Sequence, residues 1–299
     1  MILSGCGTAL ITPFRLDGTV DDAAFAAHVK AQIDSGITLL VPCGTTGEAS
    51  TLTETEWLHV IELTCNLSAG RVPVFAGCTH NSTAVAIKRI QLLSQIAGLT
   101  GILTANPYYN RPGQEGQYQH FRAIAEATWL PIMLYNIPGR TGANLEPQTV
   151  VRLAGLPNIV GIKESSGNLI QITELLRTVP PHFRVFAGDD SLALPILALG
   201  GAGLISVASN VIPEQISKMV LAALGNDWPA ARELNRRFFP LMQALFFEPS
   251  PAPVKAVLNF LGHCHSTVRL PMTPVSEETR NHLESLCREQ DLKSLPAER

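Results

Sequence analysis

Short apolar runs alternate with helical patterns along most of the chain. Each run is rich in β-branched residues and is followed by a turn signal and then by a segment of helical periodicity, which is typical of a strand–helix repeat. The runs recur roughly every 20 to 35 residues. The eight predicted strands are residues 7–11, 37–41, 72–76, 100–104, 131–135, 159–163, 183–187 and 203–207.

The segments between these runs carry helix signals. Thr53 and Glu56 have the spacing of a capping box, and Trp57 then begins an apolar stripe that predicts one buried helix face. A similar stripe over residues 25–33 stops at Gly36, a residue type that favours the end of a helix. These segments are therefore expected to be helices that cover the strands.

The strands are almost continuously hydrophobic, as in a parallel sheet covered by helices. Eight repeats favour a closed (β/α)₈ barrel (a TIM barrel) over an open doubly wound sheet, although the sequence alone leaves closure open. Helical patterns continue at 213–224, 228–247, 253–261 and 276–289. We predict a barrel over residues 1–224 and a helical extension over 225–299 packed on it, because no flexible linker separates them.

Composition narrows the function classes. Hydrophobic residues make up 46% of the chain and charged residues 16%, which permits a large core and excludes disorder of the whole. The formal net charge of −3 leaves no basic surplus for a nucleic-acid backbone. The uncharged stretch 191–213 is interrupted by proline and glycines, so we expect no membrane span.

The first residues and the cysteines of the chain bear on its cellular location and on metal binding. Residues 1–14 show no positively charged leader, so we expect a cytoplasmic protein. The six cysteines form no CxxC pair, which favours reduced thiols. His263, Cys264 and His265 are adjacent, and neighbours in sequence rarely converge on one ion, so no metal site is expected there.

Reactive groups of such barrels stand at the carboxyl ends of strands, and Lys163 ends an apolar strand there. Side chains alternate between the two faces of a strand, so Lys163 is on the same face as Ile159 and Gly161 and faces the barrel axis if they do. Burying an ammonium group costs several kcal/mol, so an unpaired lysine in this place is expected to be a neutral amine, which attacks carbonyl groups. The alternative is a structural lysine paired with Glu164.

Other polar residues follow neighbouring strands. Tyr135 and Tyr109 offer phenols for proton transfer, or they simply fill the barrel mouth. Thr45 and Thr46, between two glycines, offer hydroxyl and N–H groups to an anionic oxygen, although an ordinary turn has the same composition. The guanidinium of Arg140 is a side-chain group that binds carboxylates with two hydrogen bonds. The alternative is an arginine that is only solvated.

The segments that carry this lysine, the tyrosines, the threonines and the arginine together resemble the pyruvate-dependent class I aldolases of the N-acetylneuraminate lyase superfamily. Within that superfamily they resemble the members that act on aspartate semialdehyde. The similarity runs from TALITPF at 8–14 to LPMTP at 270–274, and includes GTTGE, YNIP and GIKE. The RTG run after YNIPG, with NPYYNRP upstream, indicates the aspartate-semialdehyde branch.

The resemblance implies a role for each of these residues. Lys163 would form an imine with pyruvate, and the derived enamine would attack aspartate semialdehyde. Tyr135 would move protons through Thr45 to Tyr109, which the neighbouring subunit of a tight dimer supplies within a homotetramer. The substrates would be held by Thr46, Arg140, Gly188 and Ile205. Neither a metal nor an organic cofactor is implied.

The resemblance also predicts a regulatory site. Asn81 and Tyr108 match residues that bind lysine in feedback-inhibited relatives. Val85 stands where such relatives carry a glutamate, and Glu54 and Trp57 replace histidines. We therefore expect weak inhibition by lysine, or none.

Two other functions compete with this one. A sister aldolase would use the same imine with a sugar acid such as N-acetylneuraminate or a keto-deoxy sugar acid, but the sugar lyases of the superfamily generally lack an arginine at the place of Arg140. A binding or regulatory protein that kept the barrel without turnover would have no reason to preserve the lysine, tyrosines and threonines together.

Overall fold

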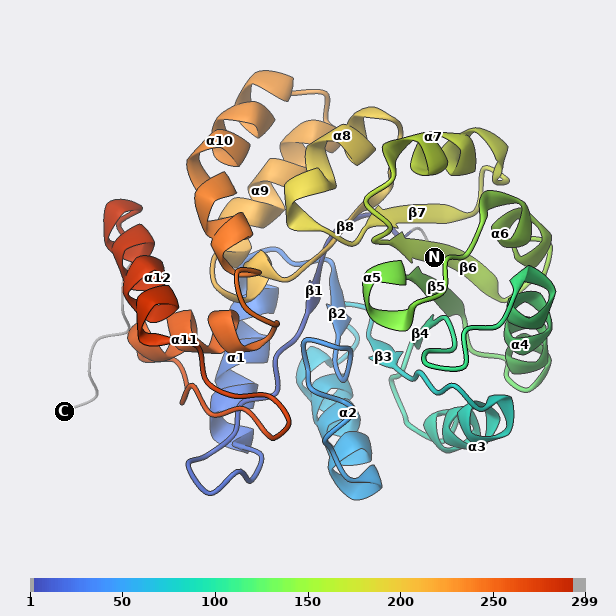
Figure 1. Ribbon diagram of the computed structural model, residues 1–299, viewed down its shortest axis with the longest axis horizontal. Coiled ribbons are helices and arrows are strands. Elements are labelled where there is room, and N and C mark those ends of the chain that lie inside the picture. The colour runs from blue at the N-terminus through green and yellow to red at the C-terminus, as the bar shows by residue number, and fades with distance from the viewer. Residues whose placement is uncertain (1–2, 293–299) are drawn as a thin grey trace.

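Eight parallel strands surround the centre of the molecule in the computed structural model, which describes residues 3–292 (Figure 1). Every predicted strand is present, with bounds that differ by up to three residues. The strands are β1 (Gly5–Ala9), β2 (Leu39–Val41), β3 (Phe75–Gly77), β4 (Gly101–Ala105), β5 (Ile132–Asn136), β6 (Ile159–Glu164), β7 (Arg184–Ala187) and β8 (Gly203–Ser206).

The strands close into a barrel. Their hydrogen-bonded order is β2-β1-β8-β7-β6-β5-β4-β3. The two ends of this order meet at a parallel bridge between Leu40 and Val74, and the Gly77 N–H donates to the Pro42 carbonyl over 2.9 Å. The predicted TIM barrel is therefore confirmed, and the doubly wound alternative is wrong.

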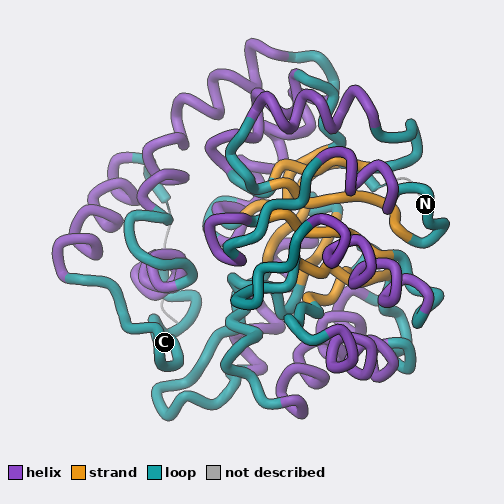
Figure 2. The backbone as a smooth tube through the Cα atoms, turned by 45° about the vertical axis from the view of Figure 1, so that its right-hand side comes forward, coloured by secondary structure: helices purple, strands orange, loops and turns teal. Residues whose placement is uncertain are grey.

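Helices cover the outside of the strands (Figure 2). They are α1 (Asp22–Asp34), α2 (Glu54–Ser68), α3 (Thr83–Leu93), α4 (Gln114–Glu126), α5 (Pro138–Thr141), α6 (Pro147–Leu153), α7 (Leu169–Thr178), α8 (Ala193–Ala198), α9 (Pro213–Leu224), α10 (Trp228–Ala244), α11 (Ala252–Phe260) and α12 (Glu277–Glu289). Helix α9 follows the last strand, and α10 to α12 come after it.

The helix ends follow the sequence signals. Thr53 and Glu56 form the predicted capping box at the start of α2, and Trp57 is buried behind it. Helix α1 ends at Asp34, and Gly36 follows with a φ of 83°, a left-handed conformation that glycine adopts without steric cost. Short-range chemistry therefore sets these boundaries.

Two apolar clusters separate the inside of the barrel from its outside. The inner cluster includes Leu39, Phe75, Met133 and Phe186, and the outer cluster fills the space between the strands and the helices. Ile159 lies in the outer cluster, not in the inner one, because the β5–β6 register shifts between Ile132 and Met133. Gly161 and Lys163 are therefore on the same face, as predicted, but Ile159 is not on that face.

The C-terminal helices pack on the barrel. Helices α10, α11 and α12 lie together beside the barrel (Figure 1). Leu241 of α10, Val257 of α11 and Leu283 of α12 belong to the outer cluster. The division into a barrel over 1–224 and an extension over 225–299 stays a prediction, and residues 293–299 of the latter lie outside the described chain. Within residues 3–292, no helix combines the length and apolar character needed to cross a membrane.

Candidate active site

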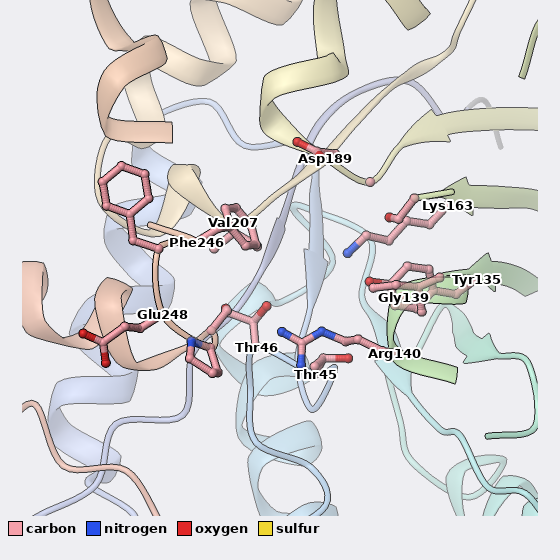
Figure 3. Close-up of a pocket in the computed structure, with 16 residues that line it drawn as sticks. Thr45, Thr46, Tyr135, Gly139, Arg140, Lys163, Asp189, Val207, Phe246 and Glu248 are labelled. Atoms are coloured by element: carbon pink, nitrogen blue, oxygen red, sulfur yellow. The ribbon is translucent and has the colours of Figure 1, made fainter. Parts of the chain in front are cut away.

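Lys163 lies near the end of β6 and faces into the barrel. It is in register with Tyr135 on β5 and with Phe186 on β7, both members of the inner cluster. The residue is 4% exposed, and its Nζ lies 4.5 Å from the centroid of the Tyr135 ring. Figure 3 shows the amine directed into a cavity at the barrel mouth.

That cavity has a volume of about 590 Å³. It brings together six residues that were selected from the sequence. The remaining lining consists of neighbours of these residues, such as Ile137 and Ser165, and of Asp189, Val207 and residues 246–250. The selected residues are Thr45, Thr46, Tyr135, Arg140, Lys163 and Gly188.

The amine of Lys163 has no carboxylate partner in the described part of the chain, where every ion pair joins other residues. Glu164 points elsewhere: its carboxylate accepts hydrogen bonds from Asn136 Nδ2 over 3.0 Å and from the Ser166 N–H over 2.6 Å. Burial raises the pKa of this carboxyl group above its usual range. The structural pairing of Lys163 with Glu164 is therefore not formed.

The turn after β2 presents Thr45 and Thr46 to the cavity. Gly47 donates to the Gly44 carbonyl over 3.1 Å, and Thr12 Oγ1 donates to the Gly47 carbonyl over 2.8 Å. A Cβ atom on Gly47 would lie 3.0 Å from both the Cys43 N and the Leu10 O. Within residues 3–292 the N–H groups of Thr45 and Thr46 have no acceptor, so they are available to an anionic ligand.

Arg140 reaches the cavity from the short helix α5. The segment is held from behind, because Thr141 Oγ1 donates to the Ile137 carbonyl over 3.1 Å and Asn106 Nδ2 donates to the Ala143 carbonyl over 2.8 Å. The guanidinium forms no ion pair among the described residues. It therefore remains available for a substrate carboxylate.

Gly188 and Ile205 occupy different places. Gly188 lines the cavity, and a Cβ atom there would collide with Ser165 Oγ and lie 2.9 Å from Lys163 Cγ. Glycine at this position therefore leaves room for the lysine side chain. Ile205 is fully buried in the inner cluster and is not among the lining residues, whereas Val207, two residues later, is.

Tyr109 stands outside the cavity of its own chain. It is 89% exposed and has a φ of 71°, a conformation that is uncommon for a bulky residue. Such strain persists only where the surroundings or a function require it. Its position is compatible with a contact outside this chain.

A second cavity of about 510 Å³ adjoins the first and shares Thr45, Tyr135 and Arg140 with it. Tyr108 lines this second cavity. Asn81 follows His80, another lining residue, and its carbonyl accepts a hydrogen bond from Asn110 Nδ2. Their regulatory role stays a prediction.

Trp57 also lines the second cavity. Its Nε1 donates to the Gly77 carbonyl over 3.0 Å, and the Arg89 guanidinium lies 5.7 Å from its ring centroid. Val85 and Glu54 are exposed on α3 and α2. The tryptophan therefore has the packing role that the sequence analysis gave it.

Part of the cavity wall was not predicted from the sequence. Asp189 lies two residues after the end of β7, so the rule that reactive groups stand at the carboxyl ends of strands also applies to it. Residues 246–250 between α10 and α11 line the opposite wall (Figure 3). The helical pattern predicted over 228–247 ran too far, since α10 ends at Ala244, and the contact of the loop with the barrel depends on how the C-terminal helices pack.

The described residues contain no group of three or more histidine, cysteine, aspartate or glutamate side chains placed to hold a metal ion. The arrangement offers instead one buried amine, one phenol beside it and two separate points for anions. These are the parts that imine chemistry on a keto acid requires.

Comparison with known proteins gives a consistent result. The family model described as "Dihydrodipicolinate synthetase family" matches residues 2–290. The chain is 59% identical to the 4-hydroxy-tetrahydrodipicolinate synthase of Acidobacterium capsulatum over 97% of this chain and 96% of that protein. It is 55% identical to the protein of the same name from Koribacter versatilis, over 97% and 96%.

Solved structures agree with the sequence comparisons. The dihydrodipicolinate synthase of Aquifex aeolicus superposes with a TM-score of 0.95 at 39% identity, covering 98% of this chain and 100% of that one. The similarity extends through the barrel and the helices that follow it.

Proposed function

The chain belongs to the dihydrodipicolinate synthetase family, and from this membership and the geometry of the barrel mouth we propose its reaction. It is a lyase that condenses pyruvate with L-aspartate 4-semialdehyde to 4-hydroxy-tetrahydrodipicolinate, in the diaminopimelate route to lysine. The observation that carries the proposal is the buried amine of Lys163, which faces the cavity without a carboxylate partner among the described residues.

Lys163 starts the reaction. Its Nζ attacks the ketone carbon of pyruvate, and loss of water gives an imine. Removal of a methyl proton converts the imine to an enamine, whose carbon attacks the aldehyde of the second substrate. The amino group of the adduct then attacks the imine carbon, closes the ring and releases the lysine.

We assign the proton transfers of the reaction to Tyr135. Its ring packs against the Lys163 amine, so its hydroxyl group is near the atoms that gain and lose protons. Thr45 lines the same cavity and would continue the path to a second phenol. We assign that phenol to Tyr109 of a neighbouring subunit, since the tyrosine of the same chain is exposed and outside the cavity.

Two anionic substrates need two anion-binding points. The hydroxyl of Thr46 and the unpaired N–H groups of the turn suit the carboxylate of pyruvate, next to Lys163. Arg140 suits the carboxylate of the semialdehyde at the mouth. Gly188 keeps the approach to the lysine open.

The assembly follows from the same assignment. A site that lacks its second phenol is completed by a tight dimer, and we propose that two such dimers form a homotetramer. A cytoplasmic location also stays a prediction, which the six cysteines, all free thiols, suit.

An assay with alternative substrates tests the reaction. The protein is given pyruvate with aspartate semialdehyde, and separately N-acetylneuraminate or a keto-deoxy sugar acid. We expect turnover of the first pair and at most trace cleavage of the sugar acids, because Arg140 binds a carboxylate where a sugar would need hydroxyl-binding groups. Efficient cleavage of a sugar acid with no turnover of the semialdehyde would contradict the proposal.

A further inference from the structure

A buried ion pair between Glu48 and Lys255 joins the turn after β2, which carries Thr45 and Thr46, to the C-terminal helices. Glu48 ends the turn after β2 with a φ of 52°, and its carboxylate is nearly inaccessible. Its Oε1 accepts from Lys255 Nζ on α11, and its Oε2 accepts from the Arg269 N–H over 3.0 Å. Both carboxylate oxygens are therefore bound by residues far along the chain.

Lys255 is surrounded on several sides. Its Nζ also donates to the Thr267 carbonyl over 2.9 Å and lies 4.0 Å from the centroid of the Phe14 ring. The residue is fully buried, and burial lowers the pKa of its amine while Glu48 opposes that change. The ammonium form therefore depends on its partner carboxylate.

Arg269 fixes the far end of the same region. Its guanidinium donates to the Thr51 carbonyl over 2.9 Å and pairs with Glu56 of α2. It also lies 4.4 Å from the centroid of the Phe14 ring, so that ring lies close to both cationic groups. The segment from Glu48 to Glu56 is thus anchored at several points by the chain after α10.

The pair connects two walls of the catalytic cavity. Thr45 and Thr46 are separated from Glu48 by Gly47 and line one wall. Residues 246–250 line the other and lead into α11, which carries Lys255. Hydrogen bonds from the Gly47 and Glu48 N–H groups to the Gly44 and Thr45 carbonyls shape the turn internally, whereas the Glu48 carboxylate ties it to the chain after α10.

We propose that Glu48 and Lys255 are positioning residues, which hold the turn so that Thr45 and Thr46 meet the carboxylate of pyruvate. The inference rests on the proposed function, and neither residue touches the substrate. A buried pair adds little to stability compared with apolar residues of the same size, but it fixes geometry through directed hydrogen bonds. Displacement of binding groups by about 1 Å costs up to about 100-fold in rate.

Trapping of the imine with borohydride at increasing pyruvate concentrations measures this directly. The label per chain is read by intact mass, and its position by peptide mapping. In Glu48→Gln and in Lys255→Met, we expect the pyruvate concentration for half-labelling to rise at least about tenfold. At saturating pyruvate the label should still be on Lys163.

The double variant Glu48→Gln/Lys255→Met separates positioning from stability. Removal of both charges leaves neither one unpaired, so its thermal midpoint should return toward that of the wild type. Its pyruvate requirement should stay raised, because the turn is still not held. If a single variant does not fold, the double variant alone decides the question.

A matched control is Glu214→Gln, which breaks an exposed ion pair with Lys218 on α9 and should label like the wild type. Labelling of the folded variants at the wild-type pyruvate concentration would overturn the inference. So would a double variant in which the pyruvate requirement returns together with stability. A wild-type chain that takes no label at any pyruvate concentration would overturn the proposed function itself, and the inference with it.

Discussion

A lysine at the end of a buried strand is available to a keto acid only when no acid neutralises it. Lys163 meets this condition because the neighbouring Glu164 faces Asn136 and Ser166 on the other side of the strand. The sequence predicted Lys163 from its place after an apolar run. It did not reveal the register shift that moves Ile159 outward, because a strand irregularity depends on the partner strand.

Arg140→Ala tests the anion site at the mouth. A charge-assisted hydrogen bond contributes about 1.5–3 kcal/mol, so KM for aspartate semialdehyde should rise about tenfold or more in steady-state kinetics. Imine formation with pyruvate alone should be unchanged. As a control, Arg122→Gln removes an exposed arginine paired with Glu126 and should leave both values as they are. Equal weakening of both substrates would remove the assignment.

At the scale of elements, the prediction was strongest where local chemistry decides. All eight strands and the capping box of α2 were found from sequence. Strand bounds were less accurate, as for β3, which begins at Phe75 and not at residue 72. Residues 246–250 were missed because their contact with the cavity arises only when α10 and α11 pack against the barrel.

The start of α2 carries a pH-dependent interaction. Hydrogen bonds from Arg269, and then from Thr53, lower the pKa of Glu56 to about 2. The pKa of Glu56 in the folded state is below its value of about 4.3 in the unfolded state. The ionised carboxylate therefore stabilises the fold fully above about pH 4.3, and this stabilisation is lost as the pH falls toward 2.

Glu56→Gln should therefore lower the free energy of unfolding at pH 7 by about 1 kcal/mol, a modest value because water screens the pair. The difference from the wild type should shrink as the pH falls from about 4.3 toward 2. Urea unfolding at several pH values measures it, with Glu233→Gln, which removes an exposed carboxylate paired with Arg236, as the control. A difference that stays constant down to pH 2 would show that the charge of Glu56 does not stabilise the fold.

At the scale of the whole molecule, the proposed site takes its second phenol from another copy of the chain. Tyr109 is held in an uncommon backbone conformation and is almost fully exposed, which is explained if it enters the cavity of a second copy. Neither exposure nor strain was visible in the sequence. The role of Tyr109 was predicted from the resemblance to relatives.

Tyr109→Phe removes the hydroxyl group without removing the ring. Loss of a proton-transfer group should lower kcat by about 100-fold or more while the pyruvate concentration for half-labelling changes little. Tyr118→Phe, which alters a half-buried tyrosine below the Arg152 guanidinium, is the matched control and should keep full turnover. A parallel loss of kcat and of pyruvate binding would exclude the proton relay.

Regulation by lysine is expected to be weak or absent. Val85 offers no carboxylate for the α-amine of lysine, and Trp57 is engaged with the Gly77 carbonyl and the Arg89 guanidinium. Steady-state assays with added lysine should show less than half-inhibition at 1 mM, a concentration at which a ligand with a Kd of about 1 mM half-fills its site. Half-inhibition at a lower lysine concentration would contradict this expectation.

The central claim is that Lys163 forms an imine with pyruvate. Reduction with borohydride in the presence of pyruvate, followed by mass analysis, should attach one reduced pyruvate per chain, located on Lys163 and on none of the other five lysines. The Lys163→Arg variant should take no label. An unlabelled wild-type chain, or a label on another lysine, would contradict the account.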